Sequence, residues 1–127
     1  MKLTVLVDNN TVIDRYFLGE PALSYYLEEG DIKLLFDVGY TDIFIKNAQK
    51  MNINLDNVNT IVLSHGHNDH VGGLADLIRY YAAAFAERGK YNKPRLIAHP
   101  LTFCDKYEGK NEIGSVIKEH TLQKHFN

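Results

Sequence analysis

The chain has 127 residues, a length that fits one domain. Hydrophobic residues make up 45% of it and charged residues 24%, which is typical of a folded globular protein and excludes a disordered chain. The formal net charge of −2 argues against a broad nucleic-acid-binding face, and no apolar run approaches the roughly 18 residues that suggest a membrane span. The single cysteine, Cys104, cannot form an internal disulfide, and the first residues turn polar after Val7, too early for a secretory signal. We therefore expect a cytoplasmic protein.

Hydrophobic periodicity predicts an alternation of strands and helices along the chain. In chain order, we expect strands over residues 2–7, 22–28 and 32–36, a helix over 42–51, a strand over 60–63, a helix over 74–88, a strand over 95–98 and the start of a helix over 122–126, with residues 101–118 left ambiguous. The continuous apolar run from Leu34 to Phe36 suggests burial on both faces of a sheet. Thr41 is a suitable N-cap for the first helix, and Gly89 is a suitable C-cap for the second. This alternation indicates an α/β fold, in which ligand sites gather at the carboxyl ends of strands.

Three of the six histidines lie within six residues, directly after the strand predicted over residues 60–63. The segment from Ser64 to Gly73 reads Ser-His-Gly-His-Asn-Asp-His-Val-Gly-Gly, and it holds four good metal ligands: His65, His67, Asp69 and His70. Imidazole nitrogen together with carboxylate oxygen suits zinc, iron or manganese and does not suit calcium. The alternative is a polar surface loop that is merely rich in histidine. Four ligands at this spacing, between a buried strand and an amphipathic helix, favour a metal site.

The spacing of these four residues decides which of them can share an ion. In an extended segment, residues two apart point to the same side, so His65 and His67 can chelate one ion just beyond the strand, which a helix would forbid. Gly66 between them lacks a side chain and tolerates unusual dihedral angles. Asp69 and His70 are adjacent, and a turn in the loop could aim both at a second ion.

These residues resemble the motifs of a known family. The pattern His-x-His-x-Asp-His after a buried strand, followed by Gly72-Gly73 and a helix, resembles the signature of the metallo-β-lactamase superfamily. Phe36-Asp37-Val38-Gly39 is similar to the Phe-Asp-Thr-Gly motif of that family, with Val38 in place of threonine. A less specific similarity, to the dihydropterin-aminobenzene-phosphate synthase-like branch, rests on residues 6–9, 19–24 and 98–100.

The resemblance implies a fold and a metal site. Members of this branch are longer, so residues 1–127 are expected to form only part of a domain. That part would be the N-terminal half of an αββα sandwich, with a mixed sheet and flanking helices. The C-terminal half, and the metal ligands that it carries in the family, would be missing. It implies two divalent ions, with zinc as the first choice and iron or manganese as alternatives. His65 and His67 would hold one ion, and Asp69 and His70 the other. Asp69 would also be catalytic, by orienting the attacking water or accepting its proton, and Asp37 would support the site by hydrogen bonding without binding metal.

Three functions stay open at this stage. The first is a metal-dependent hydrolase, in which two metal ions activate water to attack an ester or phosphoester of a small-molecule substrate, present here as a half-domain. The second is a non-catalytic module that binds metal or a partner, and the third is a di-iron redox protein. Half of such a sandwich would expose an apolar sheet face, so we expect a homodimer or a separate C-terminal half to cover it. Neither nucleic acid nor a membrane is an expected partner.

Further polar residues are weaker candidates for the site. His99 follows the strand predicted over residues 95–98 and is a candidate for the pocket rim, although a hydrogen-bonded histidine at a strand end is the better interpretation. The remaining residues are expected in structural or surface positions: His120, His125, Asp8 and Glu20 at the polar surface, and Cys104 buried or half-buried.

Overall fold

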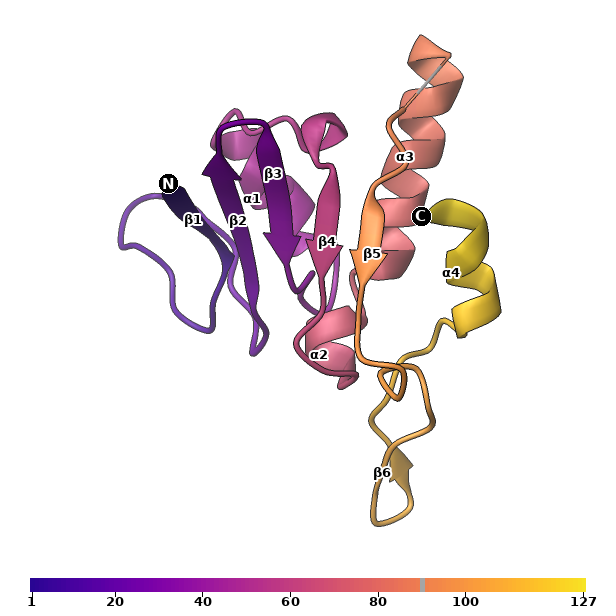
Figure 1. The fold of residues 1–127 in the computed structure, drawn as a ribbon. Helices are drawn as coiled ribbons and strands as arrows, with labels where there is room; N and C mark the ends of the chain where they lie inside the picture. The colour runs from indigo at the N-terminus through magenta and orange to yellow at the C-terminus, as the bar shows by residue number, and fades with distance from the viewer. Residues whose placement is uncertain (90) are drawn as a thin grey trace.

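The computed structural model describes residues 1–89 and 91–127 and contains a mixed five-stranded sheet (Figure 1). Its strands lie in the order of the sequence: β1 (Lys2–Val7), β2 (Ser24–Glu29), β3 (Ile32–Phe36), β4 (Thr60–Val62) and β5 (Arg95–Ile97). β1, β2 and β3 pair antiparallel, whereas β3, β4 and β5 pair parallel. The predicted mixed α/β sheet is confirmed, and each strand lies within two residues of its expected bounds.

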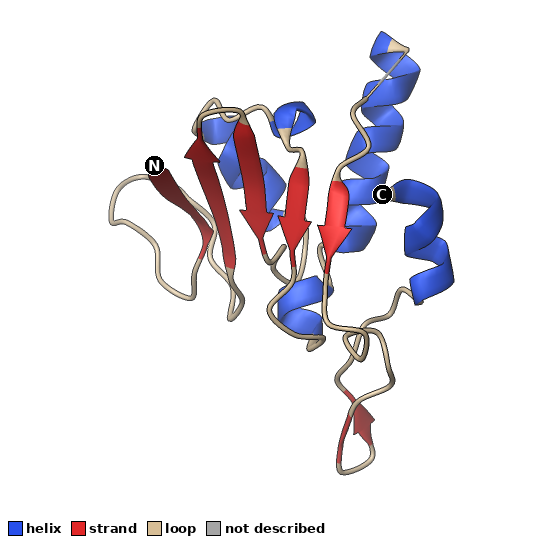
Figure 2. Cartoon of the chain, in the orientation of Figure 1, coloured by secondary structure: helices blue, strands red, loops and turns tan. Residues whose placement is uncertain are grey.

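Along the chain, the helices follow the strands from β3 onward, and in space they lie beside and behind the sheet (Figure 2). They are α1 (Ile43–Lys50), the short 3₁₀ helix Leu55–Asn57, α2 (Asn68–Val71), α3 (Leu74–Arg88) and α4 (Glu119–His125). α3 has the predicted bounds and ends at Gly89, whose φ of 74° is the left-handed conformation that suits glycine. The N-cap of α1 is Asp42, one residue after the predicted Thr41, and its side chain makes no capping bond; the Thr41 hydroxyl donates to the Glu20 carboxylate at 2.7 Å and accepts from the Ile43 N–H at 3.4 Å. In the described part of the chain, no helix has both the length and the apolar character to cross a membrane.

One face of the sheet carries the hydrophobic core. Leu35 of β3 and Ile61 of β4 are fully buried, together with Phe44 of α1 and with Leu74 and Leu77 of α3. α1 and α3 lie on this side of the sheet, behind the strands in Figure 1. The apolar stripes that predicted these two helices are therefore the surfaces that close this face of the sheet.

The other face of the sheet is apolar and open. The strand register places Val5, Tyr25, Phe36, Val62 and Ile97 in one row across all five strands. Val5 and Ile97 are each 43% exposed, and in the described residues no helix lies on this face (Figure 1). The predicted burial of residues 34–36 on both faces is therefore wrong: Leu35 is buried, but Leu34 and Phe36 are only half-buried because no helix among the described residues covers their side of the sheet.

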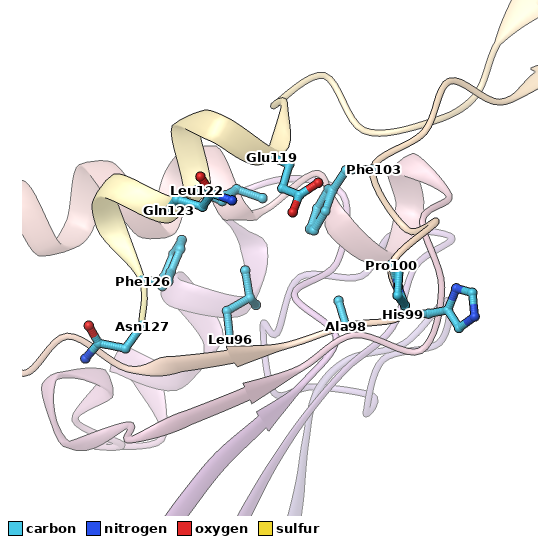
Figure 3. A pocket seen from close by; sticks show the side chains of 10 residues that line it. All are labelled: Leu96, Ala98, His99, Pro100, Phe103, Glu119, Leu122, Gln123, Phe126 and Asn127. Carbon is cyan, nitrogen blue, oxygen red and sulfur yellow. The ribbon is translucent and has the colours of Figure 1, made fainter.

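The chain after β5 forms an extension that the sequence left ambiguous. A turn leads to a small hairpin of β6 (Tyr107–Glu108) and β7 (Asn111–Glu112), and then to α4, which begins three residues earlier than predicted. Asn127 pairs through its backbone with β5, since its carbonyl accepts from Leu96 N–H at 2.8 Å. α4 and β5 enclose a cavity of about 200 Å³ (Figure 3). Two expectations for this region are wrong: Cys104 is exposed on the turn, and His125 is half-buried.

Candidate metal centre

The candidate site is built at the carboxyl ends of the adjacent parallel strands β3 and β4. Asp37 follows β3 directly, and its N–H donates to Val62 O at 2.9 Å, which extends the pairing one residue beyond the sheet. The chain leaving β4 turns through residues 64–67 into α2, and Val38 N–H then donates to His70 O at 3.0 Å. This contact brings the end of the histidine-rich segment back beside Asp37.

Asp37 is the buried carboxylate to which other polar groups of the site donate hydrogen bonds. Its side chain is fully buried and accepts from the Ser64 N–H at 2.8 Å and from the Ser64 hydroxyl at 2.6 Å. Nδ1 of His70 lies 2.7 Å from the same carboxylate. Three donors thus satisfy a carboxylate that would be costly to bury alone. Its backbone is left-handed, with φ of 55°, a conformation that aspartate adopts more readily than most residues.

The hydrogen bonds of Asp37 fix the tautomers of two histidines. To donate to a carboxylate, His70 Nδ1 must carry the ring proton, which leaves a lone pair on Nε2. The Ser64 hydroxyl donates its one proton to Asp37, so it accepts from His65 Nδ1 at 2.9 Å, and His65 Nε2 is also left with a lone pair. Metal-binding histidines typically donate their second ring N–H in this way.

Burial favours the neutral form of His65. Desolvation lowers the pKa of the His65 imidazole below its ordinary value, and the neighbouring His70 and His67 lower it further. The neutral ring is the form that binds a metal ion, because a protonated imidazole has no free lone pair.

Three side chains converge on one point. His65, Asp69 and His70 each offer a ligand atom, and these three atoms lie within 4.8 Å of one another. The ring centroids of His65 and His70 are 4.1 Å apart, and His70 Nε2 is 3.6 Å from the Asp69 carboxylate. Two imidazole nitrogens and one carboxylate oxygen form a donor set that zinc commonly takes, so the residues present fit a divalent metal ion.

His67 lies beside this group but outside it. Its ring centroid is 4.6 Å from that of His65, its side chain is exposed, and its backbone bridges to Gly114. α2 begins at the next residue, so the single turn of helix carries Asp69 and His70 back toward His65. The structure therefore brings together His65, Asp69 and His70, and the pairing of His65 with His67 at one ion stays a prediction.

The segment of residues 99–114 packs against the outer side of the histidine-rich loop. A Cβ atom on Gly66 would lie 1.7 Å from the Thr102 carbonyl oxygen, so only glycine fits at this contact. The Lys106 ammonium donates to three carbonyls of its own turn, at 2.9–3.1 Å: those of Leu101, Thr102 and Cys104. His99 is exposed at the strand end and lines a cavity together with His65.

Two residues that support the site carried no clear signal in the sequence. Glu20, expected at the surface, is buried, and it accepts from the Tyr40 and Thr41 N–H groups at 2.9 and 3.1 Å. It thereby fixes the turn at residues 39–41, and Gly39 O of this turn accepts from Gly73 N–H at 3.1 Å. The partners of Glu20 lie about twenty residues away in sequence, so local pattern could not reveal them. Ser64 directly precedes His65, and only this position in the motif indicated that it belongs to the site. Asp8 and His120 are exposed as expected.

Comparison with known proteins agrees with this architecture. Residues 18–93 match the model of the metallo-beta-lactamase superfamily, and the chain belongs to that superfamily. Over 96% of its length it is 33% identical to an uncharacterized protein of Methanocaldococcus jannaschii, of which it covers 44%. Over 62% of its length it is 31% identical to 7,8-dihydropterin-6-methyl-4-(beta-D-ribofuranosyl)-aminobenzene-5'-phosphate synthase of the same organism, of which it covers 29%.

Solved structures show the same fold. A metal-dependent hydrolase of the beta-lactamase superfamily superposes with a TM-score of 0.69 and 25% identity, over 98% of this chain and 40% of the hydrolase. The metallo-beta-lactamase fold protein YhfI from Bacillus subtilis gives a TM-score of 0.56 and 18% identity, over 84% of this chain and 42% of YhfI. The family resemblance and the fold class expected from the sequence are thus confirmed. The chain spans less than half the length of these relatives.

Proposed function

We propose that this chain carries the metal-binding part of a metal-dependent hydrolase that acts on an ester or phosphoester of a small molecule. The observation that carries the proposal is the convergence of His65, Asp69 and His70, whose ligand atoms lie within 4.8 Å of one another. The name of the metal-dependent hydrolase that superposes on the chain supports the same reaction class.

In this proposal, the four residues of the motif hold two divalent ions, with zinc as the first choice and iron or manganese as alternatives: His65, His67, Asp69 and His70. Bound divalent ions supply Lewis acidity, which acidifies water and offsets the negative charge that develops on the attacked ester. Asp37 orients His70 directly and His65 through Ser64, which leaves a lone pair on Nε2 of each ring.

Asp69 has the catalytic role in this proposal. Its side chain is 42% exposed, so its carboxylate has one side toward solvent while it lies 3.6 Å from His70 Nε2. A carboxylate in this position can orient a water molecule or accept its proton. No serine or cysteine nucleophile is needed.

A second part of the proposal concerns the open sheet face. An apolar row across five strands is costly to leave in water, and the relatives have more than twice the length described here. A polypeptide corresponding to the rest of that length packs on this face and supplies further metal ligands. Light scattering of the purified chain would also detect the alternative, a homodimer. A stable monomer that binds no such polypeptide would contradict the proposal that this face is covered.

Metal analysis and turnover test the first part. The purified chain is loaded with zinc, and metal content is measured by mass spectrometry for the wild type and for the double variant His67→Ala, Asp69→Ala. The wild type should bind zinc and the double variant should lose it, while His120→Ala, an exposed histidine, serves as the control. Full metal content in the double variant would refute the site.

Turnover of generic phosphoesters and thioesters then separates the candidate functions. Hydrolysis that requires the loaded metal supports the proposal. Zinc binding without turnover, with the completing polypeptide present, would favour a non-catalytic module, and redox-active iron would favour a di-iron protein.

A further inference from the structure

The histidine-rich loop separates two cavities of different charge. The cavity on one side has a volume of about 260 Å³, and His65, His99 and Lys106 are among the residues that line it. The cavity on the other side is about 560 Å³, and Asp69 and Glu108 line it. Among the described residues that line the smaller cavity, none carries a carboxylate, whereas one carries an ammonium group. An anion is therefore favoured in the smaller cavity and disfavoured in the larger one.

The backbone fixes the tautomer of His99. Its Nδ1 accepts a hydrogen bond from the Leu101 N–H at 3.1 Å, and a nitrogen that accepts carries no proton. The ring proton therefore resides on Nε2, which makes this atom a hydrogen-bond donor. Binding a metal through Nε2 would move the proton to Nδ1, where it would face the Leu101 N–H. In this turn His99 is consequently a donor and not a metal ligand.

The position of the ring is consistent with this role. Thr102 N–H donates to His99 O at 2.9 Å, so the turn that presents the ring is held at two points. Figure 3 shows the imidazole at the end of the cavity between β5 and α4, pointing away from it. The ring also lines the smaller cavity beside His65.

We propose that the smaller cavity is a subsite for an oxyanion substituent of the substrate, a phosphate or a carboxylate, and that His99 Nε2–H is its donor. Lys106 contributes positive charge but no hydrogen bond, because three backbone carbonyls occupy its ammonium protons. This inference rests on the proposed function, since it places the anion beside His65. The binding of a free oxyanion does not itself require metal.

Nuclear magnetic resonance of the metal-free chain tests the proposal. The ¹⁵N-labelled chain, treated with a chelator, is titrated with inorganic phosphate in one arm and with acetate in the other. We expect saturable shifts of the His99 ring nitrogens and the Gly66 amide, and none at Glu108 in the other cavity. The arm with tighter binding identifies the substituent as phosphate or carboxylate.

Two matched variants sharpen the test. In His99→Asn, the asparagine side-chain oxygen can still accept from the Leu101 N–H, as asparagine does in turns, but no donor lies at the position of His99 Nε2. Its affinity for the tighter anion should fall by about tenfold or more, which corresponds to one hydrogen bond to a charged group. His120→Asn should have no effect.

Several outcomes would overturn the proposal. The first group is seen in the metal-free titration: no binding of either anion, chemical-shift changes centred on Glu108, or a His99 ring that carries its proton on Nδ1. The second is an anion affinity that His99→Asn leaves unchanged. The third is anion binding that appears only with zinc and is lost in His65→Ala. Zinc affinity, measured on the same samples, is independent of these results. A wild type that binds phosphate but no zinc would refute the proposed hydrolase and leave the subsite standing.

Discussion

Neighbouring residues of one strand show how differently the two faces of the sheet are completed. Leu35 is fully buried against the helices, whereas Leu34, on the opposite face, is only half-buried. Both faces are apolar, but the chain closes only one of them. The comparison teaches that helices of this chain close one face of the sheet, whereas the other face is the one for which we propose a covering polypeptide.

The largest expected effect contrasts the two leucines directly. Leu35→Ala should lower the free energy of unfolding by about 2–5 kcal/mol, because it leaves a cavity in the closed core. Leu34→Ala should lower it by only about 1 kcal/mol, since its side chain already meets solvent. Urea denaturation followed by circular dichroism measures both. Equal losses would contradict the comparison.

The next largest effect concerns the contact behind the site. Gly66→Ala should destabilise the chain by about 1–3 kcal/mol, because the new methyl group would overlap the Thr102 carbonyl. Gly30→Ala is the control: a Cβ there meets no atom within 4 Å, and only the left-handed backbone opposes it. Thermal melts of the two variants should show the greater loss at Gly66, and the reverse order would mean that the loop is not packed as described.

A smaller effect, on metal affinity, tests whether the site is preorganised. Asp37→Asn keeps the shape and tolerates the left-handed backbone, but it removes the charge that orients two imidazoles. Zinc affinity, measured by competition with a chelator, should fall by about 10–100-fold. Ser64→Ala should have a weaker effect: it removes the link to His65 and one of the three donors to Asp37, but it leaves the carboxylate charge and its bond to His70 in place. An unchanged affinity in Asp37→Asn would show that the histidines need no such support.

The smallest effect on stability belongs to the open face. Ile97→Lys, at a position 43% exposed, should change the free energy of unfolding by no more than about 0.5 kcal/mol. It should nevertheless abolish association with a partner, because it places a charge in the apolar row. Leu101→Lys, at an exposed position outside the sheet, should leave association intact. Light scattering at matched concentrations distinguishes the two variants.

The sequence predicted best what depends on local periodicity. α3 and β3 have the predicted bounds, because each carries a regular apolar pattern and a clear terminal signal. The hairpin of β6 and β7 was not predicted, since strands of two residues are too short to show a period. The run from Leu34 to Phe36 predicted burial on both faces, but only Leu35 is fully buried, because an apolar run does not say whether this chain covers both faces of its sheet.

The motif named four candidate ligands but not which of them converge. The sequence paired His65 with His67 and Asp69 with His70, whereas the structure brings His65, Asp69 and His70 together. The exposure of His67 depends on where α2 begins, and the hydrogen bonds of Glu20 depend on a turn about twenty residues away. Such long-range contacts are set by the tertiary fold, which no local pattern encodes.

The close contact at Gly66 also has a consequence for motion. There is no space between its Cα and the backbone of Thr102, and Asn68 N–H donates to Ile113 O at 2.8 Å farther along the same segment. The segment over residues 99–114 therefore cannot move inward without shifting the loop that carries the histidines. In the proposed hydrolase, a molecule that pushed this segment inward on entry would also displace His65, so entry would be coupled to the position of a proposed metal ligand.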